Sequence, residues 1–211
     1  MKRLSVFSFF VLSVFLAPGV LVPLSAAEDK SAEDWVSTPE QWKKLSKGEV
    51  LLLVSQTDGK GAGHSATAAI LVDAPRGKVW DVVYDSDAAA GFQDSLVSSQ
   101  IVEETESYAL VEQVVKVGFH KAKYVVRQKP DRPDAIVFER ESGDMKEIDG
   151  FWRFFTVVTG DEEKTLAVYR LSLKPDIPLP GFLVRKSIAT NIPDTLYSVR
   201  DEVIRRQSEG S

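Results

Sequence analysis

Residues 181–203 read GFLVRKSIATNIPDTLYSVRDEV, and this stretch decides the fold. Apolar residues recur every three or four positions along it, as they do on one face of an α-helix. They are Val184, Ile188, Ile192, Leu196, Val199 and Val203. The spacing predicts a long amphipathic helix that closes the chain. Since proline lacks the backbone N–H of a regular helix, Pro193 predicts a kink or restart near Asn191.

The chain before this helix consists mainly of short β-type segments. Apolar, β-branched runs predict strands at residues 49–58 and 64–73. About six further strands, joined by turns with Gly, Asp or Pro, are predicted between Phe92 and Pro175, which is typical of an antiparallel meander. Only the last helix is long enough to cover the apolar face of such a sheet. The sequence therefore predicts an α+β fold, a curved antiparallel sheet around the C-terminal helix, with a cavity between them.

Residues 73–92, DAPRGKVWDVVYDSDAAAGF, interrupt the strands. Three valines share one helical face and predict a short helix that seals the core: Val79, Val82 and Val83. Pro75 suits the first turn of this helix, and the carboxylate of Asp73 can cap it. The helix breaks at Asp85, and a second short helix is predicted to end at Gly91. We expect the break to form a corner beside the mouth of the cavity.

The first 27 residues have the layout of a secretory signal peptide. Lys2 and Arg3 precede a long apolar run, and Ser25 and Ala27 suit cleavage after Ala27. We therefore expect the mature protein in the periplasm or outside the cell. An uncleaved membrane anchor is the alternative, because the run is nearly long enough to span a bilayer.

Residues 28–48 form a polar lead-in segment before a domain at residues 49–208. Its stretch TPEQWKKL predicts a short helix with Thr38 as N-cap and Pro39 at the first helical position. We expect this segment to pack on the domain.

The charge of the chain limits the kinds of molecule that it can bind, and its lack of cysteine limits how its fold can be stabilised. Loss of Lys2 and Arg3 with the signal peptide leaves 24 basic residues against 31 acidic ones, so the formal charge changes from −5 to −7. Such a domain is a poor nucleic-acid binder, because phosphate contacts need clustered Lys and Arg. The chain has no cysteine, so its fold depends on an apolar core and not on disulfides. We expect a monomer that binds a small molecule, with transient membrane contact left open.

Motifs for catalysis or cofactor binding are missing from the sequence. It has no cysteine nucleophile, no G-x-S-x-G elbow and no histidine–carboxylate spacing for zinc. Gly61, Gly63 and Ala66 fit a dinucleotide-binding pattern, but the following residues predict a strand instead of the required helix. We expect His64 and His120 to be exposed. The sequence thus predicts no catalytic residue, no metal site and no cofactor.

Polar and aromatic side chains on apolar strand faces mark the candidate cavity wall. Trp152 and Phe154 share one face of their strand, and Phe151 and Phe155 share the other. A buried amide or phenol needs a hydrogen-bond partner, so each polar member is either a structural hydrogen bond or a group that orients an apolar ligand. The candidates for ligand binding are Gln113, Tyr124, Gln128, Trp152 and Tyr169.

The order of these segments resembles a known family. The residues that carry the resemblance include APRGKVWDVVYD, which is followed by Phe92, and GDMKEIDGFW with the later TLAVYRL and LP. Over about residues 50–205 the chain is similar to the START-like superfamily, in its polyketide cyclase/dehydrase, lipid-transport and coenzyme Q-binding branch (SRPBCC-type). The resemblance implies a helix-grip fold with a deep hydrophobic pocket and no universal catalytic set. Trp80, Asp85 and Trp152 also match family positions, which we interpret as architectural.

These observations predict an exported carrier or sensor of a lipid, a quinone or a polyketide-like molecule. This function predicts an apolar cavity of several hundred cubic ångströms. Two alternatives remain. A cyclase- or dehydratase-type enzyme would need a titratable group with a shifted pKa in the pocket. An interaction module with a vestigial cavity would have a collapsed pocket and an exposed apolar patch.

Overall fold

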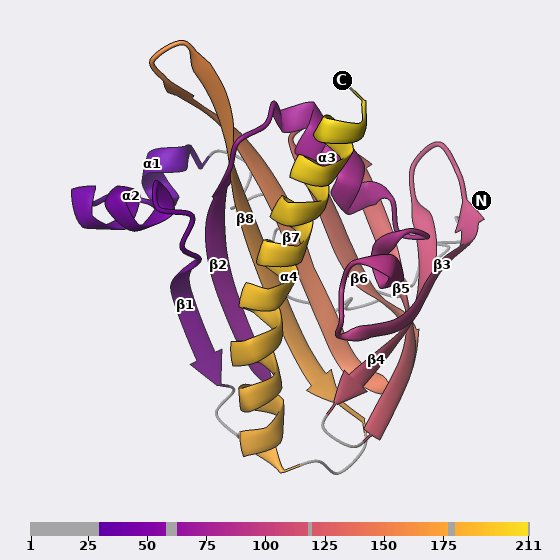
Figure 1. Cartoon of the computed structure of the whole chain (residues 1–211). Coiled ribbons are helices and arrows are strands. Elements are labelled where there is room, and N and C mark those ends of the chain that lie inside the picture. The colour runs from indigo at the N-terminus through magenta and orange to yellow at the C-terminus, as the bar shows by residue number, and fades with distance from the viewer. Residues whose placement is uncertain (1–29, 58–62, 118–119, 177–179, 211) are drawn as a thin grey trace, which may run out of the picture. The chain divides into compact units, whose positions relative to one another are not determined.

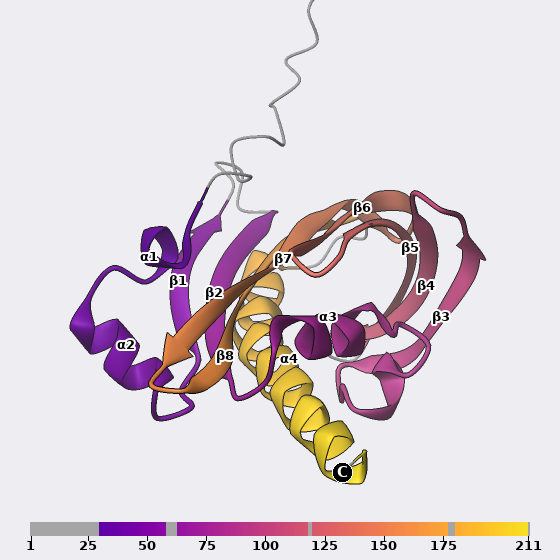
Figure 2. The ribbon, with the colours of Figure 1, turned by 90° about the horizontal axis from the view of Figure 1, so that it is seen from above.

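Eight strands form one antiparallel sheet that curves around the last helix (Figures 1 and 2). The computed structural model describes residues 30–57, 63–117, 120–176 and 180–210. The strands are β1 Leu51–Thr57, β2 His64–Val72, β3 Leu96–Glu104, β4 Ala109–Val117, β5 His120–Asp131, β6 Ala135–Gly143, β7 Met145–Thr159 and β8 Glu162–Pro175. Their order in the sheet is β1-β2-β8-β7-β6-β5-β4-β3. The predicted α+β fold and meander are confirmed, and the first hairpin joins the meander at its last strand.

The helix α4, Gly181–Glu209, lies against the concave face of the sheet (Figure 2). All six apolar positions predicted for its inner face are buried. The predicted restart near Asn191 is wrong, because the helix continues through Pro193 without a break. A proline inside a helix costs about 3 kcal/mol, whereas each buried Ile or Leu side chain contributes about 1.5–3 kcal/mol. Burial of Ile188, Ile192 and Leu196 therefore outweighs the lost hydrogen bond.

The segment between β2 and β3 forms the helix α3, Arg76–Tyr84, and the 3-10 turn η2, Ala89–Gly91. Val79 and Val82 are buried as predicted, but the second helix is only this single turn. The capping role predicted for Asp73 is wrong. Pro75 occupies the N-cap, and the Asp73 carboxylate instead lies 2.7 Å from the ammonium of Lys164 on β8.

Trp80 fixes α3 to the sheet. Its indole N–H donates to the carbonyl of Ala135 at 3.0 Å, and its ring stacks on Tyr84 with the centroids 4.6 Å apart. Ala135 begins β6, so a single side chain joins the helix to the middle of the meander. This contact accords with an architectural role for Trp80.

The lead-in segment forms two short helices, α1 Ala32–Trp35 and α2 Pro39–Leu45, within the compact unit Ser31–Ser211. The predicted N-cap is confirmed, since Thr38 Oγ1 accepts from the Gln41 N–H at 3.3 Å and the Gln41 side chain accepts in return. These helices help build a second apolar cluster on the convex face, which includes Phe151 and Phe155. The opposite strand face of β7 places Trp152 and Phe154 in the main core, as the alternation predicted.

His64 departs from its predicted exposure, because it is buried with 6% of its surface exposed. The hydroxyls of Ser55 and Thr57 lie 3.1 Å from Nε2 and 2.9 Å from Nδ1 of the imidazole. A neighbouring strand thus satisfies both ring nitrogens, which the sequence did not predict. His120 is exposed, as expected.

The dinucleotide pattern lacks its helix. Gly61 lies outside the described residues, but the stretch that follows, His64–Val72, is the strand β2. Within the part of the chain that the structure describes, no helix is both long and apolar enough to cross a membrane.

Candidate ligand-binding site

A cavity of about 130 Å³ lies between α4 and the concave face of the sheet. All five residues predicted for the cavity wall line it: Gln113 on β4, Tyr124 and Gln128 on β5, Trp152 on β7 and Tyr169 on β8. Side chains that lie up to 56 positions apart in the sequence, from Gln113 to Tyr169, therefore converge on one space. The corner predicted after α3 also reaches this space, through Ser86.

The cavity is smaller than the several hundred cubic ångströms that we expected. Its volume of about 130 Å³ is close to that of an engineered protein cavity that binds benzene. The aromatic rings explain the difference, since Tyr169 stacks on Trp152 with centroids 4.3 Å apart and lies 6.3 Å from the ring of Phe138. In this form the cavity has room for about one six-membered ring.

A hydrogen-bonded chain crosses one wall of the cavity. The Tyr124 hydroxyl donates to Gln113 Oε1 at 3.0 Å, and Gln113 Nε2 donates to the Ser99 hydroxyl at 3.3 Å. This chain joins β5, β4 and β3 and fixes the orientation of the amide. At the α3–η2 corner, the Ser86 hydroxyl donates to Gln128 Oε1 at 3.4 Å. The two half-buried amides therefore have hydrogen-bond partners within the protein.

Tyr169 differs from Tyr124, because no hydrogen bond joins its hydroxyl to another group in the described residues. Burial raises the pKa of Tyr169 above the ordinary tyrosine value, and the neighbouring Tyr124 raises it further. Burial likewise raises the pKa of Tyr124. Both phenols are therefore neutral at physiological pH, and Tyr169 presents a hydrogen-bond donor to the cavity.

Acid–base chemistry has few candidates in this cavity. No Asp, Glu or His is among the described residues that line it, and Lys116 at its rim is the only charged one. Likewise, the described part of the chain contains no group of three His, Cys, Asp or Glu residues placed to hold a metal ion. The arrangement can enclose an apolar molecule and donate a hydrogen bond to one of its polar atoms.

Sequence reasoning missed the polar side of α4. Ser187, Asn191 and Thr195 line the cavity mouth, and they recur every four residues beside the buried apolar face. This period was visible in the sequence, since positions four apart lie on one side of a helix. Phe138 was also missed, because nothing in its own strand distinguishes a cavity-lining phenylalanine from a core one.

The fold and the cavity define a START-like helix-grip domain. The sequence model of the family "Polyketide cyclase / dehydrase and lipid transport" matches residues 72–200, and the chain belongs to this family. No curated protein matches the chain.

Solved structures share the fold at low sequence identity. The Zhui aromatase/cyclase from Streptomyces sp. R1128 is 22% identical with a TM-score of 0.59, over 68% of this chain and 95% of that one. A protein from Thermus thermophilus is 20% identical with a TM-score of 0.59, over 67% and 98% of the two chains. A STAR-related lipid transfer protein from Xanthomonas axonopodis is 15% identical with a TM-score of 0.58, over 73% and 92%. These likenesses support the START-like fold.

Proposed function

We propose that this protein is an exported carrier or sensor that binds a hydrophobic small molecule in the cavity between α4 and the sheet. The observation that carries the proposal is the cavity itself, whose wall combines stacked aromatic rings with a few oriented polar groups. Ligand sites are generally of this kind. The proposed ligand is a lipid, a quinone or a polyketide-like molecule. The family description and the fold relatives support the lipid and the polyketide-like molecule. A ligand larger than one ring requires the wall side chains to move apart.

The proposal includes export. Residues 1–27 act as a signal peptide that is cleaved near Ala27, residues 28–48 form the lead-in segment, and residues 49–208 form the ligand-binding domain in the periplasm or outside the cell. The protein acts as a monomer and contacts a membrane transiently when it collects or delivers its ligand. N-terminal sequencing of the protein from its native cells tests the cleavage, and an intact Met1 on the exported protein would overturn it.

A cavity-filling variant tests binding. Val126 is buried and lines the cavity, so Val126→Phe places a ring in the space that a ligand would use. The matched control is Val158→Phe, because 70% of the Val158 surface is exposed. We expect benzene, titrated into the wild type and the control and followed by NMR chemical shifts, to bind both, and to bind Val126→Phe at least ten-fold more weakly. Absence of binding to the wild type would overturn the proposal.

The natural ligand can be sought directly. Native mass spectrometry of the wild type, purified from its own cells, should detect a reproducible apolar molecule that the Val126→Phe variant lacks. An empty wild-type protein that also binds no apolar probe would favour an interaction module with a vestigial cavity.

A cyclase- or dehydratase-type reaction is the second candidate, and the neutral phenol of Tyr169 favours it. A neutral phenol can donate a hydrogen bond to a carbonyl oxygen as charge develops on it. The test is incubation of the extracted ligand with the wild type and with Tyr169→Phe. Loss of one water from the ligand, seen by mass spectrometry only with the wild type, would identify an enzyme. A ligand that keeps both its mass and its chromatographic retention supports the carrier or sensor, because a cyclisation without loss of water changes the retention but not the mass.

A further inference from the structure

A second hollow continues the cavity to the outside. It is an open groove of about 590 Å³ between the first half of α4, the segment after η2 and the strand β4. The groove and the cavity share six lining residues: Gln93, Ser95, Lys116, Ser187, Asn191 and Thr195. Since the same side chains line both spaces, they form one site with an inner and an outer part.

The outer part differs from the inner one in the residues that line it. Residues with a hydroxyl or an amide are the majority along the groove, although carbon atoms make up most of its exposed surface, whereas aromatic and aliphatic residues are the majority along the cavity. Its charges balance, because Lys116 and Lys186 are opposed by Asp94 and Asp194. A groove with balanced charge gives no net attraction to an anionic or a cationic group. Its hydroxyls and amides can instead donate to and accept from an uncharged polar group.

The rim of the groove is held in place by local hydrogen bonds. The Lys116 backbone N–H donates to the Ser95 carbonyl at 3.0 Å, which fixes the segment before β3 against β4. On the opposite side, Asn191 Nδ2 donates to the Ser187 hydroxyl at 3.0 Å along α4. The groups that would meet a ligand therefore lose little freedom when they bind it, which favours affinity.

We infer that the ligand is an amphiphile held with its apolar end in the cavity and an uncharged, hydroxylated head in the groove. This inference rests on the proposed function and adds the chemical class and the orientation of the ligand. The apolar end that fits the present cavity is about one ring in size. The head hydrogen-bonds to the hydroxyl groups of Ser187 and Thr195, which stand one turn to either side of Asn191 on α4.

Three probes with the same apolar end separate the two parts of the site. Benzene has no head, phenyl β-D-glucoside has a hydroxylated head, and phenyl phosphate has an anionic one. We expect the wild-type protein, titrated and followed by NMR chemical shifts, to bind the glucoside about ten-fold more tightly than benzene. That ratio corresponds to one or two net hydrogen bonds. We expect phenyl phosphate to bind no more tightly than benzene.

The double variant Ser187→Ala with Thr195→Val removes the two groove hydroxyls and keeps a β-branched residue at position 195. It should weaken binding of the glucoside about three- to ten-fold more than binding of benzene, because the two hydroxyls border the cavity as well as the groove. Retained benzene binding also proves that the variant is folded. The matched control is Ser208→Ala, which removes an exposed hydroxyl of α4 outside the groove and should change neither affinity.

The outcomes distinguish the two proposals. Equal binding of benzene and the glucoside, tightest binding of phenyl phosphate, or an equal effect of the double variant on both probes would overturn the inference and leave the ligand-binding function standing. Failure of benzene and the glucoside alike to bind the wild type would overturn the proposed function as well.

Discussion

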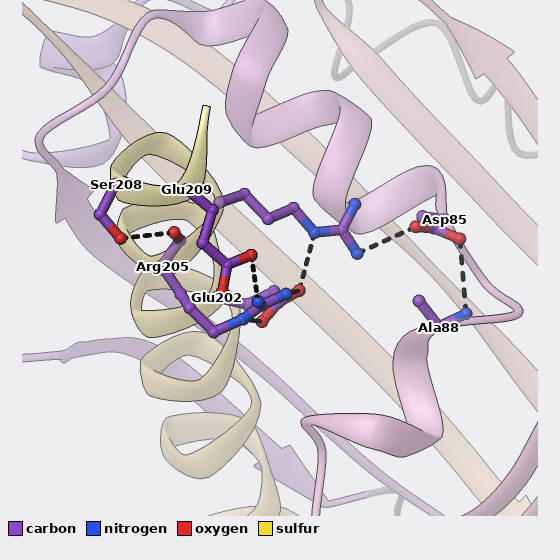
Figure 3. Close-up of polar contacts among 7 residues, drawn as sticks. Asp85, Ala88, Glu202, Arg205, Ser208 and Glu209 are labelled. Atoms are coloured by element: carbon purple, nitrogen blue, oxygen red, sulfur yellow. Dashed lines mark hydrogen bonds and ion pairs between the residues drawn. The ribbon is translucent and has the colours of Figure 1, made fainter. Parts of the chain in front are cut away.

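The guanidinium of Arg206, near the end of α4, lies 2.9 Å from the carboxylate of Asp85, where α3 ends. The same guanidinium donates to Glu202 at 2.7 Å, and Asp85 accepts from the Ala88 N–H at 3.4 Å (Glu202, Asp85 and Ala88 are labelled in Figure 3). This network joins the last helix to the corner beside the cavity. One network of ion pairs therefore joins two segments that lie more than a hundred residues apart in the sequence.

Arg206 and Asp85 should be energetically coupled. Their side chains are 32% and 40% exposed, so solvent screens the pair and the coupling should be about 0.5–1 kcal/mol. A double-mutant cycle with Arg206→Gln and Asp85→Asn, measured by urea unfolding, checks this value. The cycle of Lys129→Gln with Asp85→Asn is the control and should be additive, because Lys129 pairs instead with Glu139. Additivity of the Arg206 cycle would contradict the coupling.

Glu202 should make the free energy of unfolding depend on pH in the acid range. Hydrogen bonds from Arg205, and then from Arg206, lower the pKa of this carboxyl from 4.5 to about 2, although burial acts in the opposite direction. Since the folded state holds the carboxylate deprotonated, its contribution is present above pH 4.5 and is lost as the pH falls toward about 2. Urea unfolding between these pH values should show the loss in the wild type.

The variant Glu202→Gln should lower the free energy of unfolding at neutral pH by about 2 kcal/mol, because it removes hydrogen bonds to a charged group. Its stability should also vary less over the acid range. Glu209→Gln is the control, since Glu209 is 63% exposed and its ion pair with Arg205 lies at the surface of α4. If both variants have the same pH profile as the wild type, the role assigned to Glu202 is wrong.

The pKa of His64 should lie below that of an ordinary histidine. Burial, and then the charge of Arg185, lower its pKa below 6.5. The folded state therefore favours neutral imidazole, and this contribution to stability is present above pH 6.5 and is lost as the pH falls below it. In Arg185→Gln the pKa should rise, which NMR titration of the imidazole can measure. Lys129→Gln should leave it unchanged, and an unchanged pKa in Arg185→Gln would refute the assignment.

Gly150 should not tolerate a side chain. A Cβ at this position in β7 would lie 2.1 Å from the Arg170 carbonyl oxygen and 2.5 Å from Cζ of Phe138. Gly150→Ala should therefore lower the free energy of unfolding by about 1–3 kcal/mol, as overpacking does. Gly91→Ala is the control, because its Cβ would meet nothing within 4 Å. Equal thermal stability of the two variants would show that the strand and the ring can move apart.

Much of the fold could be predicted from the sequence, because the hydrophobic periodicity of a helix or strand lies within that one segment. The three-to-four spacing along residues 184–203 predicted α4 and its buried face, and Thr38 predicted the cap of α2. Alternation along β7 placed Trp152 and Phe154 on one side and their neighbours on the other. The five cavity residues could be named for the same reason, since a polar or aromatic side chain in an apolar row is visible without any long-range information.

The remaining features depended on partners that lie far away in the sequence. Ala68 pairs with Tyr169 across β2 and β8, and Ser55 and Thr57 enclose His64, yet no local pattern marks these pairings. The size of the cavity was likewise decided by the stack of Tyr169 on Trp152, which fills space that the curved sheet leaves open. The sequence by itself determined which faces are buried, because burial follows from each segment's own periodicity. Only the tertiary structure decided what those faces enclose, because a cavity is the space left between side chains of different segments.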